Sequence, residues 1–396
     1  MRVCLVSAEY APLVGGVADY TRLLAGHLAQ QGAEVRVLAT TGCHGEPADA
    51  FQVEGSVPRW NFGVFRALRQ MIDGFGPDVV HLQFQTAAYA MHPGVMLAPT
   101  WMQFRRSAVR CVTTFHDLRE PYLFPKAHLV RRWLLRRMAA DSARCIATND
   151  GDALALAAAG ARVTVIPIGS NVPLADEPPY PRSEVQARWG GPAEGALVGF
   201  FGLLNQAKGF DTLLHALAAL KANGRPVALL VMGDRLGASD PTNRAYAERV
   251  EALAVELGIA DSVHWTGYLP EAELSRALRS TDLCALPFTE GASYRNGTLL
   301  AALSNGVPVV TTRPPQASVP GALAPLVDGQ EALLVEPGDR ASFVAAIAKL
   351  LDEPALRARL AAAALARSRQ FAWTDIAAQH LALYRDLAVA EVGSTA

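Results

Sequence analysis

Short apolar runs rich in branched side chains alternate along the chain with longer segments whose apolar residues recur at helical spacing. Such runs are typical of strands buried on both faces of a parallel sheet, and the longer segments are typical of the helices that connect them. In the first half, the expected strands are 2–7, 34–39, 78–83, 109–115, 144–149 and 163–168. The second half repeats the pattern at 197–202, 227–233, 262–267, 282–287, 307–312 and 331–336. The pattern therefore predicts an α/β chain with two doubly wound, Rossmann-like sheets.

The break between the two series, residues 173–195, is rich in proline and glycine and has no apolar periodicity. We therefore expect an N-terminal domain over 1–178, a linker over 179–194 and a C-terminal domain over 195–373. An amphipathic helix is expected over 373–390. Because ligands of doubly wound sheets bind at the carboxyl ends of the strands, one central cleft between the two sheets is predicted.

Composition narrows the class of protein. A chain of 396 residues is longer than one hydrophobic core usually serves, which agrees with two domains. Its 36 basic and 37 acidic residues give a net charge of −1, so the overall charge does not indicate a nucleic-acid partner. The five cysteines lack C-x-x-C spacing, which predicts small core residues in a reducing compartment. Without a ~20-residue apolar stretch or a signal-peptide pattern, a cytoplasmic location is the expectation.

Two glycines, Gly15 and Gly16, follow the first expected strand and precede a helix. Glycine at this place lets backbone N–H groups approach an anion, and a helix start favours negative charge. The loop is not G-x-G-x-x-G, and no acidic residue ends the second strand, so a nicotinamide cofactor is not indicated. The alternative is that the two glycines only turn the chain.

Two further candidates follow strands directly. His116 comes after the strand 109–115, with Asp117 as an orienting partner or a helix cap. Lys208, followed by Gly209, comes after the first strand of the second half and would bring a cation to the same cleft. The alternatives are a packed or surface histidine and a solvated lysine.

The stretch 288–310 places polar residues just ahead of an apolar helix. They are Ser293, Arg295, Asn296 and Thr298. A diphosphate accepts hydrogen bonds from a helix start, a lysine and an arginine at once, so these residues predict a site for the phosphates of a nucleotide. The alternative is that Thr298 is a helix N-cap and Arg295 a surface residue.

The order of these motifs resembles that of the family 4 glycosyltransferases over nearly the whole chain. The matching segments after His116 are "VIPIGSNV", "FFGLLNQAKGFDTLL", "VMGD", "VHWTGYLP", "DLCALPF" and "GVPVVTT". The resemblance implies the GT-B fold and transfer of a sugar from a nucleotide diphosphate sugar, usually with retention of anomeric configuration. It also implies that the last helix, from 374 to 396, returns to the N-terminal domain.

The resemblance assigns roles to two residues of this chain: His116 would lie beside the transferred sugar, and Lys208 on the diphosphate. The third residue expected to act in catalysis is Arg295, which is inferred from its own loop and not from the family. The expected substrate-binding residues are Gly15, Gly16, Asp117, Gly202, Asn205, Gly233, Asp234, Gly267, Tyr268, Leu269, Glu290, Ser293, Asn296, Gly297 and Thr298. Among them, the backbone of 267–269 would meet the base, with Gly233 and Asp234 nearby.

Two departures from the family pattern stand out. The family commonly has Gly-Arg-Leu where this chain has Gly-Leu-Leu at 202–204, so an arginine of the diphosphate site is absent. The family's pair of glutamates, seven residues apart, is also absent: one register gives Ser293 and Ala301, and the other gives Glu290 and Thr298. Loss of one guanidinium contact costs ~1.5 to 3 kcal/mol. We hypothesise a variant donor site in which Arg295 and the start of the helix at 298 share the role of the missing arginine.

Several points stay open at this stage. No Asp-x-Asp follows a strand, so no metal is expected, and the nucleotide sugar is a co-substrate rather than a cofactor. The acceptor is a small molecule or a lipid-linked one, and arginines around 126–137 indicate either a peripheral membrane contact or a solvated crossover helix. A nucleotide-sugar epimerase, a phosphorylase and a non-catalytic nucleotide-sugar binder are the alternative functions. The base, the sugar and the oligomeric state are not predicted.

Overall fold

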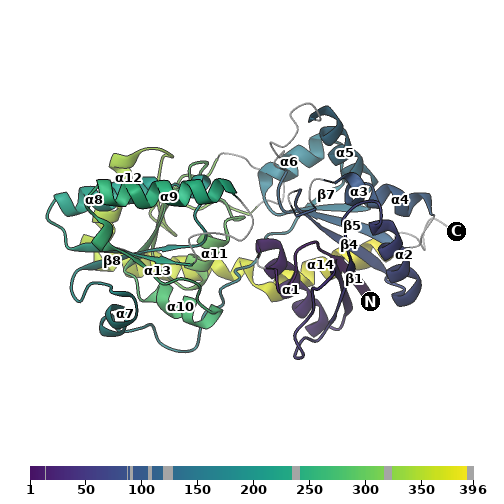
Figure 1. Cartoon of the computed structure of the whole chain (residues 1–396), viewed down its shortest axis with the longest axis horizontal. Coiled ribbons are helices and arrows are strands. Elements are labelled where there is room, and N and C mark those ends of the chain that lie inside the picture. The colour runs from purple at the N-terminus through teal and green to yellow at the C-terminus, as the bar shows by residue number, and fades with distance from the viewer. Residues whose placement is uncertain are drawn as a thin grey trace. The chain divides into compact units, whose positions relative to one another are not determined.

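A computed structural model describes residues 1–13, 15–86, 88–89, 92–105, 109–118, 128–233, 241–315 and 323–389. These residues divide into two compact units. Unit 1 contains residues 1–169 and 372–389, and unit 2 contains residues 170–315 and 323–371. Each unit is an α/β domain built around one parallel sheet, as the hydrophobic pattern predicts (Figure 1).

The sheet of unit 1 has seven strands in the order β3-β2-β1-β4-β5-β6-β7, and the six predicted strands are among them. The bounds are β1 (Arg2–Val6), β2 (Glu34–Thr40), β3 (Gln52–Val57), β4 (Val79–Phe84), β5 (Arg110–Phe115), β6 (Arg144–Ala147) and β7 (Val163–Val165). The edge strand β3 was not expected from the sequence. Its residues QVEGSV are mostly only half-buried, so it lacks the continuous apolar run that marks the central strands.

Helices cover both faces of this sheet. They are α1 (Gly16–Gln30), α2 (Val64–Phe75), α3 (Pro93–Met96), α4 (Ala98–Phe104), α5 (His128–Asp141), α6 (Asp150–Ala158) and α14 (Trp373–Val389). One core contains residues of α2 to α6 with Val80 and Leu82 of β4. The other contains Tyr20, Ile376 and Tyr384, from α1 and α14, against the opposite face of the sheet. The last helix of the chain therefore belongs to the same unit as the first strand (Figure 1).

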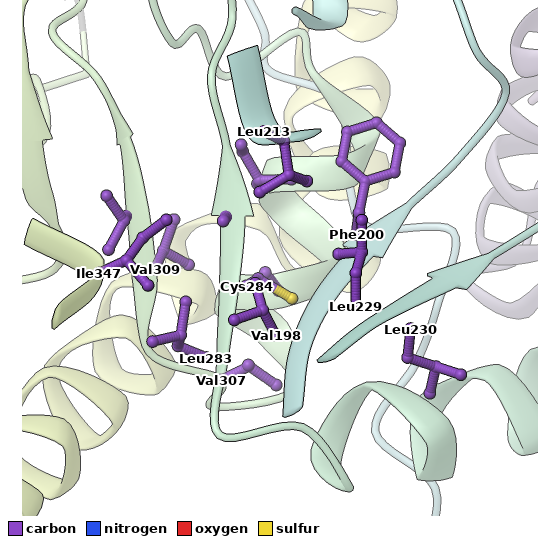
Figure 2. Close-up of a cluster of buried hydrophobic side chains, with 14 of the residues drawn as sticks. Val198, Phe200, Leu213, Leu229, Leu230, Leu283, Cys284, Val307, Val309 and Ile347 are labelled. Atoms are coloured by element: carbon purple, nitrogen blue, oxygen red, sulfur yellow. The ribbon is translucent and has the colours of Figure 1, made fainter. Parts of the chain in front are cut away.

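The sheet of unit 2 has the order β10-β9-β8-β11-β12-β13, and all its strand pairs are parallel. The bounds are β8 (Ala196–Phe201), β9 (Val227–Met232), β10 (Val263–Trp265), β11 (Leu283–Leu286), β12 (Val309–Thr312) and β13 (Leu333–Val335). The helices are α7 (Arg182–Trp189), α8 (Phe210–Ala222), α9 (Pro241–Glu256), α10 (Glu271–Arg279), α11 (Gly297–Ser304), α12 (Arg340–Asp352) and α13 (Pro354–Ser368). Figure 2 shows the core, where Val198, Phe200 and Leu229 of the sheet lie with Leu213 of α8 and Ile347 of α12.

The region expected to be a linker is part of unit 2. The division between the units falls at Gly169 and Ser170, earlier than the expected boundary at 178. Residues 179–194 include α7, and Tyr180 and Val185 are buried in the core of unit 2. The guanidinium groups of Arg188 and Arg276 lie 4.7 and 3.8 Å from the centre of the Tyr180 ring. These contacts anchor a proline-rich segment whose lack of periodicity had indicated an interdomain linker.

The cysteines and the helix hydropathy bear on the predicted class of protein. All five cysteines are buried and unpaired. None of the described helices combines the length and the apolar character needed to cross a membrane. In α5, Leu134 and Met138 are buried, whereas Leu129, Val130 and Trp133 are exposed. Because 126 and 127 lie outside the described residues, the membrane contact through 126–137 stays a prediction.

Candidate active site

Three glycines form a bare backbone ridge at the carboxyl edge of the sheet of unit 2. Gly202, Gly233 and Gly267 follow β8, β9 and β10, and their φ angles are +106°, +111° and +68°. The N–H of Gly233 donates to the carbonyl of Gly267 at 3.1 Å. A Cβ at Gly233 would lie 3.6 Å from the Cα of Gly202. Left-handed φ favours glycine, and without side chains the ridge lets a ligand approach the backbone closely.

Lys208 is held beside this ridge by its own loop. It is the last residue of the 3₁₀ turn η2 (Gln206–Lys208). Asn205 caps this turn, because its Oδ1 accepts a hydrogen bond from the backbone N–H of Lys208 at 3.2 Å. Gly209 follows with φ +64°, where a Cβ would collide with the carbonyl oxygen of Pro287. The N–H of Thr289 donates to the carbonyl of Ala207 at 3.0 Å. The lysine loop is therefore tied to the segment that follows β11.

The ammonium group of Lys208 is set against Gly202 and the start of α11. It fills the space that a Cβ at Gly202 would need, and the Oγ1 of Thr298 lies 3.1 Å from that same point. Burial lowers the pKa of Lys208 to about 8. Within the described part of the chain, no carboxylate forms an ion pair with it. A desolvated cation without a protein counter-charge is suited to an anionic ligand.

The start of α11 offers further donors. Asn296, rather than Thr298, is the N-cap residue, and its side chain does not cap the helix. Instead, its Oδ1 accepts from the N–H of Ser293 at 2.7 Å. The first helical bond runs from the N–H of Leu300 to the carbonyl of Asn296. The N–H groups of Gly297 and Thr298 are therefore available at the positive end of the helix dipole.

Arg295 lies in the loop just before α11 and forms an ion pair with Glu290. The Nη2 of Arg295 is 3.6 Å from the Oε2 of Glu290, and the arginine side chain is 30% exposed. Tyr268 is 70% exposed, whereas Leu269 packs against the core of unit 2. Leu203, at the position of the family's arginine, is exposed and Leu204 is buried. Replacement of that arginine by Arg295 stays a prediction, and Asp234 lies outside the described residues.

In unit 1, the two glycines before α1 have different surroundings: a side chain would meet Glu9 at Gly15 and open space at Gly16. The carboxylate of Glu9 occupies the space beside Gly15, with Oε2 2.5 Å from where a Cβ would lie, whereas nothing lies within 4 Å of that position at Gly16. Gly15 has extended backbone and precedes α1. Burial raises the pKa of the Glu9 carboxyl. A side chain at 15 would therefore have to displace the carboxylate of Glu9.

His116 lies at the carboxyl end of β5, where the sequence predicts it. The backbone N–H of His116 donates to the carbonyl of Phe84 at 2.9 Å, and the ring Nε2 lies 3.0 Å from the Oε1 of Gln83. The ring of Tyr20 meets it edge-on, with centroids 4.7 Å apart. Burial, and then the nearby His380, lower the pKa of His116 to about 3. The carboxylate of Asp117 accepts from Gln85 at 3.3 Å, so the described contact that fixes the ring of His116 comes from Gln83.

A buried polar network behind His116 was not found from the sequence. The two ring nitrogens of His81 bond Tyr384 at 2.6 Å and Thr114 at 2.7 Å. The Nε2 of His380 lies 3.3 Å from the hydroxyl of Tyr20, and its Nδ1 donates to the carbonyl of Ile376 at 2.7 Å. The available signal was the run DVVHLQF, where two polar residues alternate within a strand that is otherwise apolar. Polar groups in a buried strand require partners.

Comparisons with known proteins identify the family of the chain. Residues 14–172 match the model for Glycosyltransferase Family 4, and residues 195–353 match the model for glycosyl transferases group 1. The chain is 27% identical to D-inositol 3-phosphate glycosyltransferase of Corynebacterium efficiens, over 99% of this chain and 96% of that protein.

Solved structures share the fold. Sucrose-phosphate synthase of Thermosynechococcus elongatus superposes with a TM-score of 0.75 at 21% identity, over 98% of this chain and 99% of that one. Anabaena HepE in complex with UDP-glucose superposes with a TM-score of 0.71 at 19% identity, over the whole of both chains. With two family models matched in order and a relative aligned along its full length, this chain belongs to the family 4 glycosyltransferases and is an enzyme of the GT-B fold.

Proposed function

We propose that the enzyme transfers a sugar from a nucleotide diphosphate sugar to a hydroxyl group of an acceptor, with retention of anomeric configuration. The observation that carries the proposal is Lys208, a half-buried lysine whose ammonium lies against Gly202 and Thr298 and has no counter-ion among the described residues. HepE, which shares the fold, is seen in complex with UDP-glucose, and this supports a donor of the same class.

A diphosphate fits the chemistry of this part of unit 2. Its oxygens would accept from the ammonium of Lys208, from the hydroxyl of Thr298 and from the free N–H groups at the start of α11. The bare ridge of Gly202 and Gly233 leaves room for these oxygens to approach the backbone. Arg295 would add a second cation from the neighbouring loop, so that side chains rather than a divalent metal neutralise the diphosphate.

The proposed reaction breaks the bond between the anomeric carbon and the diphosphate oxygen. A new bond from the acceptor oxygen forms on the same face of the sugar, and the acceptor's proton passes to the departing phosphate oxygen. Negative charge grows on the diphosphate as that bond breaks, and Lys208 is already desolvated and in place to stabilise it. His116, neutral and fixed by Gln83, is proposed to contact a hydroxyl of the transferred sugar.

Binding of a panel of nucleotide diphosphate sugars, followed by thermal unfolding, tests the donor. A ligand at 100 times its dissociation constant stabilises the protein by roughly 2.7 kcal/mol, which is readily measured. We expect one donor to raise the melting temperature of the wild type and to have little effect on Lys208→Met. Lys349→Met removes the same charge at an exposed position of α12 and is expected to respond like the wild type.

Transfer is tested with the donor found in this way and a panel of acceptor alcohols. The anomeric configuration of the product, read from its NMR coupling constants, checks retention. Absence of a shift with every donor, or an equal shift in Lys208→Met, would overturn the proposed donor site. An inverted product would leave the donor intact but overturn the same-face mechanism.

A further inference from the structure

Two polar residues of β4, His81 and Gln83, face partners at the end of β5, Thr114 and the residue that follows the strand, His116. Both are fully buried, and alternation along the strand places them on the same face of the sheet. His81 pairs with Thr114, and Gln83 pairs with His116, two residues further along each strand. Both nitrogens of His81 are bonded within the core. Of the two pairs, only that of Gln83 and His116 reaches the carboxyl end of the strands.

The hydrogen bond from His116 to Gln83 has a direction. The atom of Gln83 that faces the ring is the carbonyl oxygen of its amide, which only accepts, so the Nε2 of His116 carries the hydrogen. A neutral imidazole has one N–H, and burial keeps this ring neutral by lowering its pKa to about 3. The Nδ1 of His116 is therefore left with a lone pair.

The ring is also prevented from turning. Tyr20 meets His116 edge-on at 4.7 Å, with 77° between the ring planes. The hydroxyl of Tyr20 lies 3.3 Å from the Nε2 of His380, whose Nδ1 donates to the carbonyl of Ile376. Both His380 and Tyr20 are buried, so the contact belongs to the packed interior of unit 1. A ring flip of His116 would have to displace Tyr20 from its hydrogen bond with His380.

The other end of the Gln83 amide lacks a partner among the described residues. Its Nε2 is buried and has no hydrogen-bond partner among the described residues. A buried donor left without a partner costs about 1 to 3 kcal/mol, and such groups in native proteins call for an explanation. A residue chosen only for packing at this position would be apolar, like Val79 and Leu82 of the same strand. The free-energy cost of the unpaired Nε2 is explained if the Oε1 of Gln83 has a function, which is to bond His116.

We propose that Gln83 is a positioning residue that holds His116 as the Nε2–H tautomer, so that Nδ1 accepts a hydrogen bond from a hydroxyl group of the substrate. The catalytic part of this inference rests on the proposed function, because it assumes that His116 contacts the sugar. The tautomer itself does not depend on activity. In this role Gln83 acts through His116 and does not itself touch the reacting atoms.

The tautomer is measured on the wild-type protein by long-range ¹H–¹⁵N correlation spectra of the histidine rings, assigned with His116→Gln. The expected pattern is a protonated Nε2 and an unprotonated Nδ1 at pH 7. An Nδ1–H pattern would mean that the amide faces the ring with its nitrogen, and it would overturn the proposal without any variant being made.

Two variants of near-equal size then separate positioning from packing. Gln83→Met removes the hydrogen bond, so we expect a mixture of tautomers and a kcat lowered at least tenfold, with the KM for donor changed less than threefold. Gln83→Glu keeps an acceptor but adds a negative charge, which favours the imidazolium. It is expected to retain the Nε2–H bond while its pH–rate profile gains an ionisation between about pH 5 and 8.

The matched control is Thr113→Val, which removes a buried hydrogen bond to Ser142, 2.8 Å away, on the other face of β5. It is expected to lower stability but to leave the tautomer and kcat unchanged. If Gln83→Met loses the tautomer and keeps its full kcat, the positioning role is wrong although the hydrogen bond is real. If the wild type transfers no sugar at all, the proposed function fails, and the spectra still decide the tautomer.

Discussion

The ammonium of Lys208 occupies the space into which a side chain at Gly202 would project, with the hydroxyl of Thr298 3.1 Å from the same point. Three segments far apart in sequence thus meet at one spot: the end of β8, the loop before α8 and the start of α11. This packing requires glycine at 202 for two separate reasons, the positive φ angle and the position of the lysine.

Gly202→Ala is therefore expected to weaken donor binding at least tenfold, because the new methyl group displaces the ammonium of Lys208. It is also expected to lower the free energy of unfolding by about 1 to 3 kcal/mol, since alanine is strained at a φ of +106°. Calorimetric titration and urea unfolding measure the two effects. Gly224→Ala is the control, because Gly224 has a φ of +75° with nothing within 4 Å. Equal loss of donor binding in both variants would show that strain alone is responsible.

Because the pKa of Lys208 is lowered, the free energy of unfolding is expected to rise as the pH becomes alkaline. Its pKa in the folded protein, about 8, is below its ordinary value of 10.5, so the unfolded chain binds more protons between these values. The penalty of the buried charge is fully present below about pH 8 and is relieved as pH rises toward 10.5. The stability of the wild type relative to Lys208→Met should therefore increase by roughly 1 to 3 kcal/mol between pH 7 and 10. A flat difference in urea unfolding across this range would contradict a desolvated ammonium that lacks a counter-ion among the described residues.

Substitutions of Arg295 and Glu290 are expected to change donor affinity in opposite directions. Arg295→Ala should weaken donor binding at least tenfold, which corresponds to about 1.4 kcal/mol, if Arg295 replaces the missing arginine. Glu290→Gln releases the guanidinium from its partner 3.6 Å away and should keep or raise the affinity. Arg225→Ala, which breaks an exposed pair with Asp352, controls for the loss of one positive charge. Unchanged titrations for Arg295→Ala would remove Arg295 from the site.

Tyr384→Phe tests the buried network of unit 1. It leaves the Nδ1 of His81 without its partner, 2.6 Å away in the wild type, in a fully buried environment. The free energy of unfolding should fall by about 1 to 3 kcal/mol. Tyr268→Phe removes a hydroxyl from a ring that is 70% exposed and should leave stability unchanged. Equal midpoints in guanidinium for Tyr384→Phe and the wild type would contradict the importance of this bond.

The hydrophobic pattern was sufficient for the fold, because central parallel strands are buried on both faces and read as continuous apolar runs. β4 is buried along its entire length and was predicted, whereas β3 at the sheet edge is mostly half-buried and was missed. Residues 179–194 were assigned to a linker because prolines and glycines interrupt their periodicity. Their anchoring depends on Tyr180 between two arginines, one of which, Arg276, is far away in sequence.

The candidate site was predicted where residues directly follow strands. His116 and Lys208 are such residues, because the end of a parallel strand fixes which edge of the sheet a residue reaches. The partner of His116 was not predictable in the same way, since Gln83 comes from a neighbouring strand and its register is set by the whole sheet. The alternative of Thr298 as the N-cap is wrong, because the helix begins at Gly297, two residues earlier than that N-cap would place it.

The membership of α14 in unit 1 has a consequence for biosynthesis. Residues 372–389 leave the ribosome after all the described residues of unit 2, so unit 2 can close its core first. Until then, the face of the first sheet that carries His81 and packs against Tyr20 of α1 lacks the helix that supplies Tyr384 and Ile376. The nascent chain thus holds an uncovered apolar surface through most of its translation, and that surface is where a chaperone would be needed.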